Sequence, residues 1–137
     1  MEDLKTLIRK FEDGSLPKAL WTHEAHLAVG CFYVYTFGKE KALEKIRINI
    51  KNYNRATGVQ NTETSGYHES ISVFWIWNIH EFIKKQDVEN TIEQLITAFI
   101  ASPFSDKNFP FEYYSKEVLL SAEARLHFIE ADKKTFK

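Results

Sequence analysis

Apolar side chains recur at every third or fourth position along most of this chain, which is the period of an amphipathic α-helix. No segment keeps up the strict alternation of apolar and polar positions that is typical of a β-strand. The pattern predicts an all-α fold, a single-domain bundle of about six helices over residues 1–137. The expected helices span residues 2–13, 23–37, 39–56, 67–85, 88–102 and 116–131.

Residues that cap or stop helices support these bounds. Thr22, Asp87 and Ser115 each precede an expected helix, where a short side chain with an oxygen can accept a hydrogen bond from an unpaired backbone N–H group. Gly14 and Gly38 follow expected helices, and glycine is the residue most often found just after a helix ends. The connections are short, so consecutive helices are expected to pack against each other.

The helices expected at residues 23–37 and 67–85 are apolar nearly all round, whereas the helix at 39–56 is amphipathic. A helix that is apolar on every side is surrounded by neighbours, so we expect these two at the centre of the bundle. Short connections favour an up, down, up arrangement of the second, third and fourth helices. The two central helices then run parallel, and their N-termini lie at the same end of the molecule.

Charge and cysteine content narrow the classes of partner and the compartment. The chain carries 18 Lys and Arg residues against 19 Asp and Glu residues, so we expect neither nucleic acid nor a membrane as a partner. The longest apolar runs fall short of the roughly 18 residues that a membrane span requires, and the N-terminus lacks the apolar stretch of a secretory signal. The single cysteine, Cys31, lies in an apolar run, which favours a small buried residue in a cytoplasmic protein.

Three of the 5 histidines lie at the starts of the two central helices. His23 and His26 share one helix face because they are three positions apart, and His68 opens the parallel helix. The positive end of a helix disfavours protonated imidazole, and the neutral ring is the form that binds metal. With Glu69, or alternatively Glu24, as a fourth ligand, these residues predict a site for one divalent ion of zinc, iron, manganese or nickel. The sequence leaves open whether the protein is an enzyme that activates a metal-bound water.

Two other hypotheses use the same end of the bundle. In one, the histidines are structural, because they cap their helices and bond to carbonyls. The protein then acts as a structural or interaction protein, and the sequence leaves its oligomeric state open. In the other, a non-catalytic pocket binds a small anionic metabolite, because helix N-termini stabilise negative charge. Arg125 lies among apolar positions of the last helix, and an ion pair with a glutamate is its alternative role. The ligand-binding residues expected for the pocket are Tyr67, Arg55, Ser115 and Arg125.

Three sequence blocks resemble a family of small bacterial helical proteins: WTHEAHL at 21–27, TSGYHES at 64–70 and YSKEVLLSAEAR at 114–125. The family patterns are WTHxAHL, GYHE followed by Thr or Ser, and YSxExLxSxEAR, and a YNxxxG pattern matches residues 53–58. The resemblance covers about residues 10–132 and implies that the histidine blocks and the last block belong to one unit. It implies no activity, because none is known for the family. Ser70 and Ala131 stand where the family pattern usually has Thr and Pro.

Overall fold

Seven α-helices and three short 3-10 segments make up the computed structural model, in which residues 3–136 are described. No β-strand occurs within those residues, and the predicted all-α class is confirmed. The α-helices are α1 (Leu4–Asp13), α2 (His23–Phe37), α3 (Lys39–Ala56), α4 (Glu69–Lys84), α5 (Ile92–Ala101), α6 (Lys116–Leu119) and α7 (Ala122–Leu126). The 3-10 segments cover Lys18–Leu20, Pro103–Ser105 and Phe109–Glu112.

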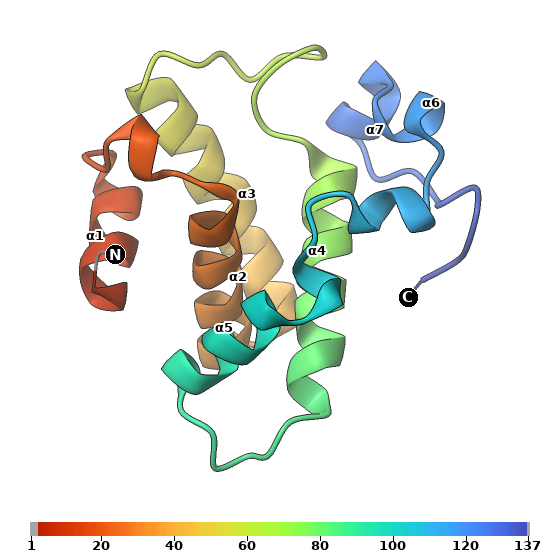
Figure 1. Ribbon diagram of the computed structural model, residues 1–137. Helices are drawn as coiled ribbons and strands as arrows, with labels where there is room; N and C mark the ends of the chain where they lie inside the picture. Colours follow the sequence, from red (N-terminus) through yellow and green to blue (C-terminus); the bar gives the residue numbers. More distant parts are fainter. Residues whose placement is uncertain (1–2, 137) are drawn as a thin grey trace.

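Helices α2, α3 and α4 form the centre of the bundle, and each packs against the other two. Figure 1 shows α2 and α4 running in the same direction, with α3 antiparallel to both. This is the up, down, up arrangement that the short connections predict. The outer helices cover this centre, since α1 packs on α3 and α2, α5 on α2, and α7 on α4. None of the helices within residues 3–136 has both the length and the apolar character needed to cross a membrane.

The bounds of α2 and α3 agree with the predicted ranges because the capping residues act as expected. The Thr22 hydroxyl accepts a hydrogen bond from the Ala25 N–H group at 3.1 Å and so starts α2. Gly38 has a φ of 84°, in the left-handed region that favours glycine, and its N–H group bonds to the Val34 carbonyl at 2.9 Å. The chain therefore turns sharply from α2 into α3, which places the two helices side by side.

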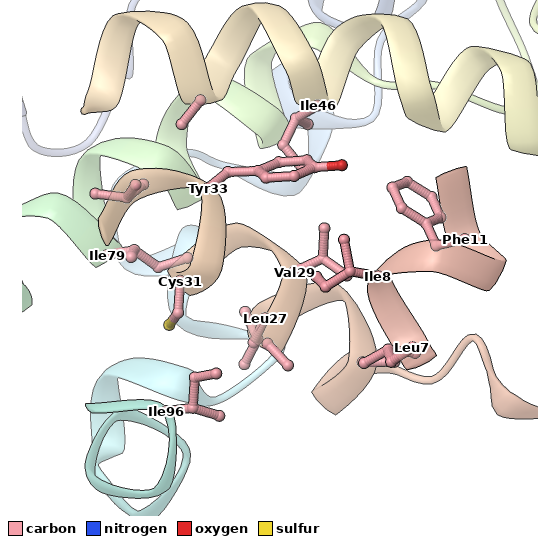
Figure 2. Close-up of a cluster of buried hydrophobic side chains, with 14 of the residues drawn as sticks. Leu7, Ile8, Phe11, Leu27, Val29, Cys31, Tyr33, Ile46, Ile79 and Ile96 are labelled. Atoms are coloured by element: carbon pink, nitrogen blue, oxygen red, sulfur yellow. The ribbon is translucent and has the colours of Figure 1, made fainter. Parts of the chain in front are cut away.

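The main core consists of buried side chains from α1 to α5, part of which Figure 2 shows. Tyr33 is fully buried, and its hydroxyl donates to Glu12 and accepts from Asn49 Nδ2 at 2.9 Å. Cys31 is buried as the sequence predicts, and burial raises the pKa of its thiol to about 12. A second, smaller cluster joins α4 to the C-terminal segment through Phe74, Tyr113, Tyr114 and Leu119.

The predicted start of the fifth helix at residue 88 is wrong, because α5 begins at Ile92. Thr91 and Gln94 form a capping box there. The Thr91 hydroxyl accepts from the Gln94 N–H group at 3.1 Å, and Gln94 Oε1 accepts from the Thr91 N–H group at 2.8 Å. Asp87, the predicted cap, instead supports a turn by accepting from the Glu89 N–H group at 2.9 Å.

The predicted single helix over residues 116–131 is also wrong, because the segment forms the two short helices α6 and α7. The Ser121 side chain accepts from the Ala124 N–H group at 3.1 Å and so starts α7 as a new helix. Beyond α7 the chain is extended, and Ser70 of α4 fixes it there. The Ser70 hydroxyl donates to the His127 carbonyl at 2.9 Å and accepts from the Ile129 N–H group at 3.0 Å. The C-terminal segment is thereby held against the start of α4.

Candidate anion-binding site

A pocket of about 460 Å³ lies between α3, the start of α4 and α7. In Figure 1 the loop from α3 to α4 runs across the top of the molecule, and α7 lies beside the start of α4. Three of the four ligand-binding residues expected from the sequence line it, namely Tyr67, Arg55 and Arg125. The full lining is Arg47, Lys51, Arg55, Asn61, Thr62, Tyr67, Glu69, Arg125, Leu126, His127 and Phe128.

Positive side chains dominate this lining. Arg47, Lys51 and Arg55 follow one another at intervals of four residues on α3, so they form one stripe along the helix. Arg125 comes from α7, and the pocket therefore holds three of the chain's four arginines. Glu69 is the one carboxylate among the described lining residues. We call this site the basic pocket.

Glu69 neutralises one of these cations. Arg47 Nε lies 3.0 Å from Glu69 Oε1, and Arg47 Nη2 lies 2.7 Å from Glu69 Oε2. The Tyr67 hydroxyl also donates to Glu69 Oε1, at 2.8 Å. Burial raises the pKa of the Glu69 carboxyl, but the hydrogen bonds from Arg47 and Tyr67 outweigh burial and hold that pKa below its ordinary value. Glu69 is therefore ionised at neutral pH and already bonded through both oxygens.

The other three cations have no carboxylate partner among residues 3–136. Arg125 Nη1 donates to the Gly66 carbonyl at 2.7 Å, so the ion pair with a glutamate that was its alternative role does not form. Arg55 donates to a neutral side-chain amide. Lys51 Nζ lies 5.2 Å from the centre of the Tyr67 ring. Three positive side chains without an ion pair among residues 3–136 therefore meet at the basic pocket, and Lys51 lies near enough to Glu69 to help lower its pKa.

The loop between α3 and α4 is held in place by its own hydrogen bonds. Asn61 Nδ2 donates to the Lys51 carbonyl at 3.1 Å, and Asn61 Oδ1 accepts from the Tyr67 N–H group at 3.0 Å. Gly66 has a φ of 78°, and a Cβ atom there would lie 2.5 Å from the Gln60 carbonyl oxygen, so this position requires glycine. The carbonyl of the same glycine receives the guanidinium from α7. The loop wall of the pocket is therefore fixed before any ligand binds.

His68 is the N-cap of α4, which begins at Glu69 and not at the predicted residue 67. Its Nδ1 accepts from the Ile71 N–H group at 3.1 Å. Its Nε2 lies 2.7 Å from the Leu119 carbonyl oxygen, which can only accept, so Nε2 carries the proton. Both ring nitrogens are occupied, and His68 acts as a capping residue that ties α4 to α6.

His23 and His26 lie in the first turn of α2, where burial, and to a smaller extent the nearby His23 ring, lowers the pKa of His26. His23 Nε2 lies 2.7 Å from the Ser105 carbonyl oxygen, and His26 Nδ1 lies 2.7 Å from the Thr22 carbonyl oxygen. Each ring therefore donates one N–H group to the backbone.

The four predicted metal ligands do not come together in this arrangement. Within residues 3–136, no three His, Cys, Asp or Glu side chains are placed to hold one metal ion. His68 is bonded on both nitrogens and Glu69 is bound to Arg47, so His23 and His26 are the members of the predicted set that keep a free nitrogen. Metal binding stays a prediction, and elemental analysis of the purified protein tests it.

Ser115, the fourth ligand-binding residue expected from the sequence, does not line the basic pocket. Its side chain accepts from the Val118 N–H group at 3.2 Å and starts α6. Sequence reasoning missed Arg47 and Lys51, which belong to the polar face of an amphipathic helix. Their spacing from Arg55 was the available signal, because cations repeated every four residues form one stripe on a helix.

Comparison with protein-family models, with curated proteins and with solved structures finds no match to this chain. Its function is therefore inferred from its own residues and their geometry. The basic pocket offers a fixed loop, one ion pair between Arg47 and Glu69, and three further cations that form no ion pair among residues 3–136. Such a site can bind an oxyanion group of a small molecule.

Proposed function

We propose that this protein binds a small molecule with a phosphate or carboxylate group in the basic pocket, without a reaction step. One observation carries the proposal: Lys51, Arg55 and Arg125 line one pocket, and none has a carboxylate partner among residues 3–136. Guanidinium groups bind phosphate and carboxylate through paired N–H donors, so two arginines favour an oxyanion ligand. The volume of about 460 Å³ lies in the range of small-molecule sites.

Glu69 and Tyr67 of the basic pocket are suited to binding and not to acid–base catalysis. A general base works best with a pKa near the working pH. The pKa of Glu69 lies below its ordinary value, and both of its oxygens already accept hydrogen bonds. Burial raises the pKa of the Tyr67 hydroxyl above its ordinary value, so this group stays protonated. We therefore propose a binding module, whose cytoplasmic location, as the sequence predicts, would expose it to metabolites with such groups.

Isothermal titration calorimetry with inorganic phosphate and with citrate tests the proposal. Low ionic strength is needed, because salt screens partly exposed charges. We expect binding at one site, and binding about tenfold weaker in Arg55→Gln, which removes one charge-assisted hydrogen bond. Arg9→Gln is the matched control, because Arg9 is the fourth arginine, lies on α1 and pairs with Asp13 at 3.7 Å. A chelator is expected to leave the binding unchanged.

A second variant separates ligand contact from support of the loop. Arg125→Gln loses the bond to the Gly66 carbonyl as well as a positive charge, so we expect it to lower both affinity and melting temperature. Arg55→Gln is expected to lower affinity alone, since Arg55 is exposed and bonds to a neutral amide. If neither anion gives heat of binding, or if Arg9→Gln weakens binding as much as Arg55→Gln, the proposal is wrong.

A further inference from the structure

A second cavity, of about 340 Å³, lies between α2, α3 and α4 and shares no lining residue with the basic pocket. Its walls are largely apolar, with isoleucines from α3 and α4 and the Trp21 and Trp75 rings. Apolar cavities of roughly 150 Å³ already hold benzene, so this one has room for a bicyclic molecule. We call it the apolar cavity. Three polar side chains, His23, His26 and Ser72, also line it, and the Ser72 hydroxyl donates to the His68 carbonyl.

The ring of His26 is fixed in both orientation and tautomer. It stacks on Trp21, with ring centres 3.8 Å apart and an angle of 28° between the planes. Its Nδ1 lies 2.7 Å from the Thr22 carbonyl oxygen, and a carbonyl can only accept, so Nδ1 carries the proton. Nε2 is therefore an acceptor, and it has no hydrogen-bond partner among residues 3–136.

The His26 ring lines the apolar cavity, and its free nitrogen has accessible surface. No side-chain nitrogen or oxygen in the described part of the chain is both fully buried and without a partner, so Nε2 of His26 keeps some accessible surface. The residue is otherwise mostly buried and lines the cavity.

The lining also indicates the charge of the occupant. Among the residues that line the apolar cavity there is no lysine, arginine, aspartate or glutamate, so a charged ligand would lose its hydration without gaining a counter-charge. An acceptor inside an apolar wall is best satisfied by a donor on the ligand. We infer that the apolar cavity binds a small, uncharged, mostly apolar molecule that carries one N–H or O–H donor, and that this donor bonds to His26 Nε2. This inference does not depend on the function proposed for the basic pocket.

Two probes that differ by one donor test the inference on the unchanged protein. Indole carries an N–H group, whereas 1-methylindole has the same rings and no donor. Their affinities are measured by calorimetry, and the nitrogen resonances of the histidine rings are followed by NMR. We expect indole to bind about three- to tenfold more tightly, as one net hydrogen bond predicts, and to shift the Nε2 resonance of His26. Equal affinities, or no saturable binding of indole, would overturn the inference.

Substitution of His26 completes the test. His26→Asn keeps an amide donor near the Thr22 carbonyl but removes the acceptor at Nε2. We expect indole and 1-methylindole to bind this variant equally, because the contact between donor and acceptor is lost from both complexes. His80→Asn is the matched control, since His80 lies on α4 and does not line the cavity. If His26→Asn still preferred indole, the assignment of His26 would be overturned. If His26→Asn does not fold, the comparison of indole with 1-methylindole on the unchanged protein tests the inference by itself.

Discussion

The partly buried ring of His26 makes the stability of this protein depend on pH. Its pKa falls from 6.5 to about 4, mainly through burial; the bond to the Thr22 carbonyl opposes this change and the nearby His23 adds to it. Because the folded-state pKa is the lower one, the unfolded chain takes up the proton first, and stability falls as the pH drops from 6.5 towards 4. Linkage gives a loss of about 2 kcal/mol between about pH 7.5 and about pH 5.

Urea unfolding at these two pH values measures the loss, with the fluorescence of the 3 tryptophans as the signal. We expect the free energy of unfolding of the wild type to fall by about 2 kcal/mol more than that of His26→Asn, which cannot titrate. Burial also lowers the pKa values of His68 and His80, but both residues are present in the two proteins. The difference between the two losses therefore isolates His26.

The same reasoning predicts the titration of the His26 ring itself. An NMR titration of the folded protein is expected to show a midpoint near pH 4 for this ring. A midpoint near 6.5 would mean that water reaches the whole ring in the folded state. Equal pH dependence of stability in the wild type and in His26→Asn would refute the reasoning in the same way.

Three further predictions concern single positions. Cys31 is expected to resist iodoacetamide in native buffer and to react in urea, as mass spectrometry would show, because its thiol is buried with a raised pKa. Thr91→Ala removes the capping box with Gln94 and is expected to cost about 1 kcal/mol in urea unfolding; an unchanged midpoint would contradict the cap. Gly66→Ala is expected to lower the free energy of unfolding by about 2 kcal/mol or more, since its Cβ would meet the Gln60 carbonyl. The same substitution is expected to weaken phosphate binding. Phosphate binding with wild-type affinity would show that the loop does not shape the pocket.

The central helices could be predicted from the sequence because local and long-range signals agree there. Thr22 and Gly38 mark the ends of α2, and the all-round apolar character of α2 fits its place at the centre of the bundle. The C-terminal segment could not be predicted in the same way. Its apolar spacing fits a helix as far as Ile129, but the N–H group of that residue bonds to Ser70, which lies 59 positions away. A pattern within one segment does not contain such a contact.

The candidate site shows the same division between local and long-range information. The predicted topology correctly brought the loop before α4 and the last block to one end of the bundle, and with them Arg55, Tyr67 and Arg125. Which side chains meet there depends on the rotation of each helix about its axis. His68 lies just outside α4 with a φ of -130°, so its ring bonds to the Leu119 carbonyl and not to the other histidines. A capping position in the sequence does not predict that direction.

Helix α3 separates the two proposed sites, which makes them independently testable. Ile46 and Ile50 line the apolar cavity, whereas the neighbouring stripe that contains Arg55 lines the basic pocket. Because no residue lines both, Arg55→Gln is expected to weaken phosphate binding and leave the affinity for indole unchanged. His26→Asn is expected to do the reverse. If each substitution weakened both ligands equally, a general loosening of the bundle would explain the losses, and neither site could be assigned from these variants.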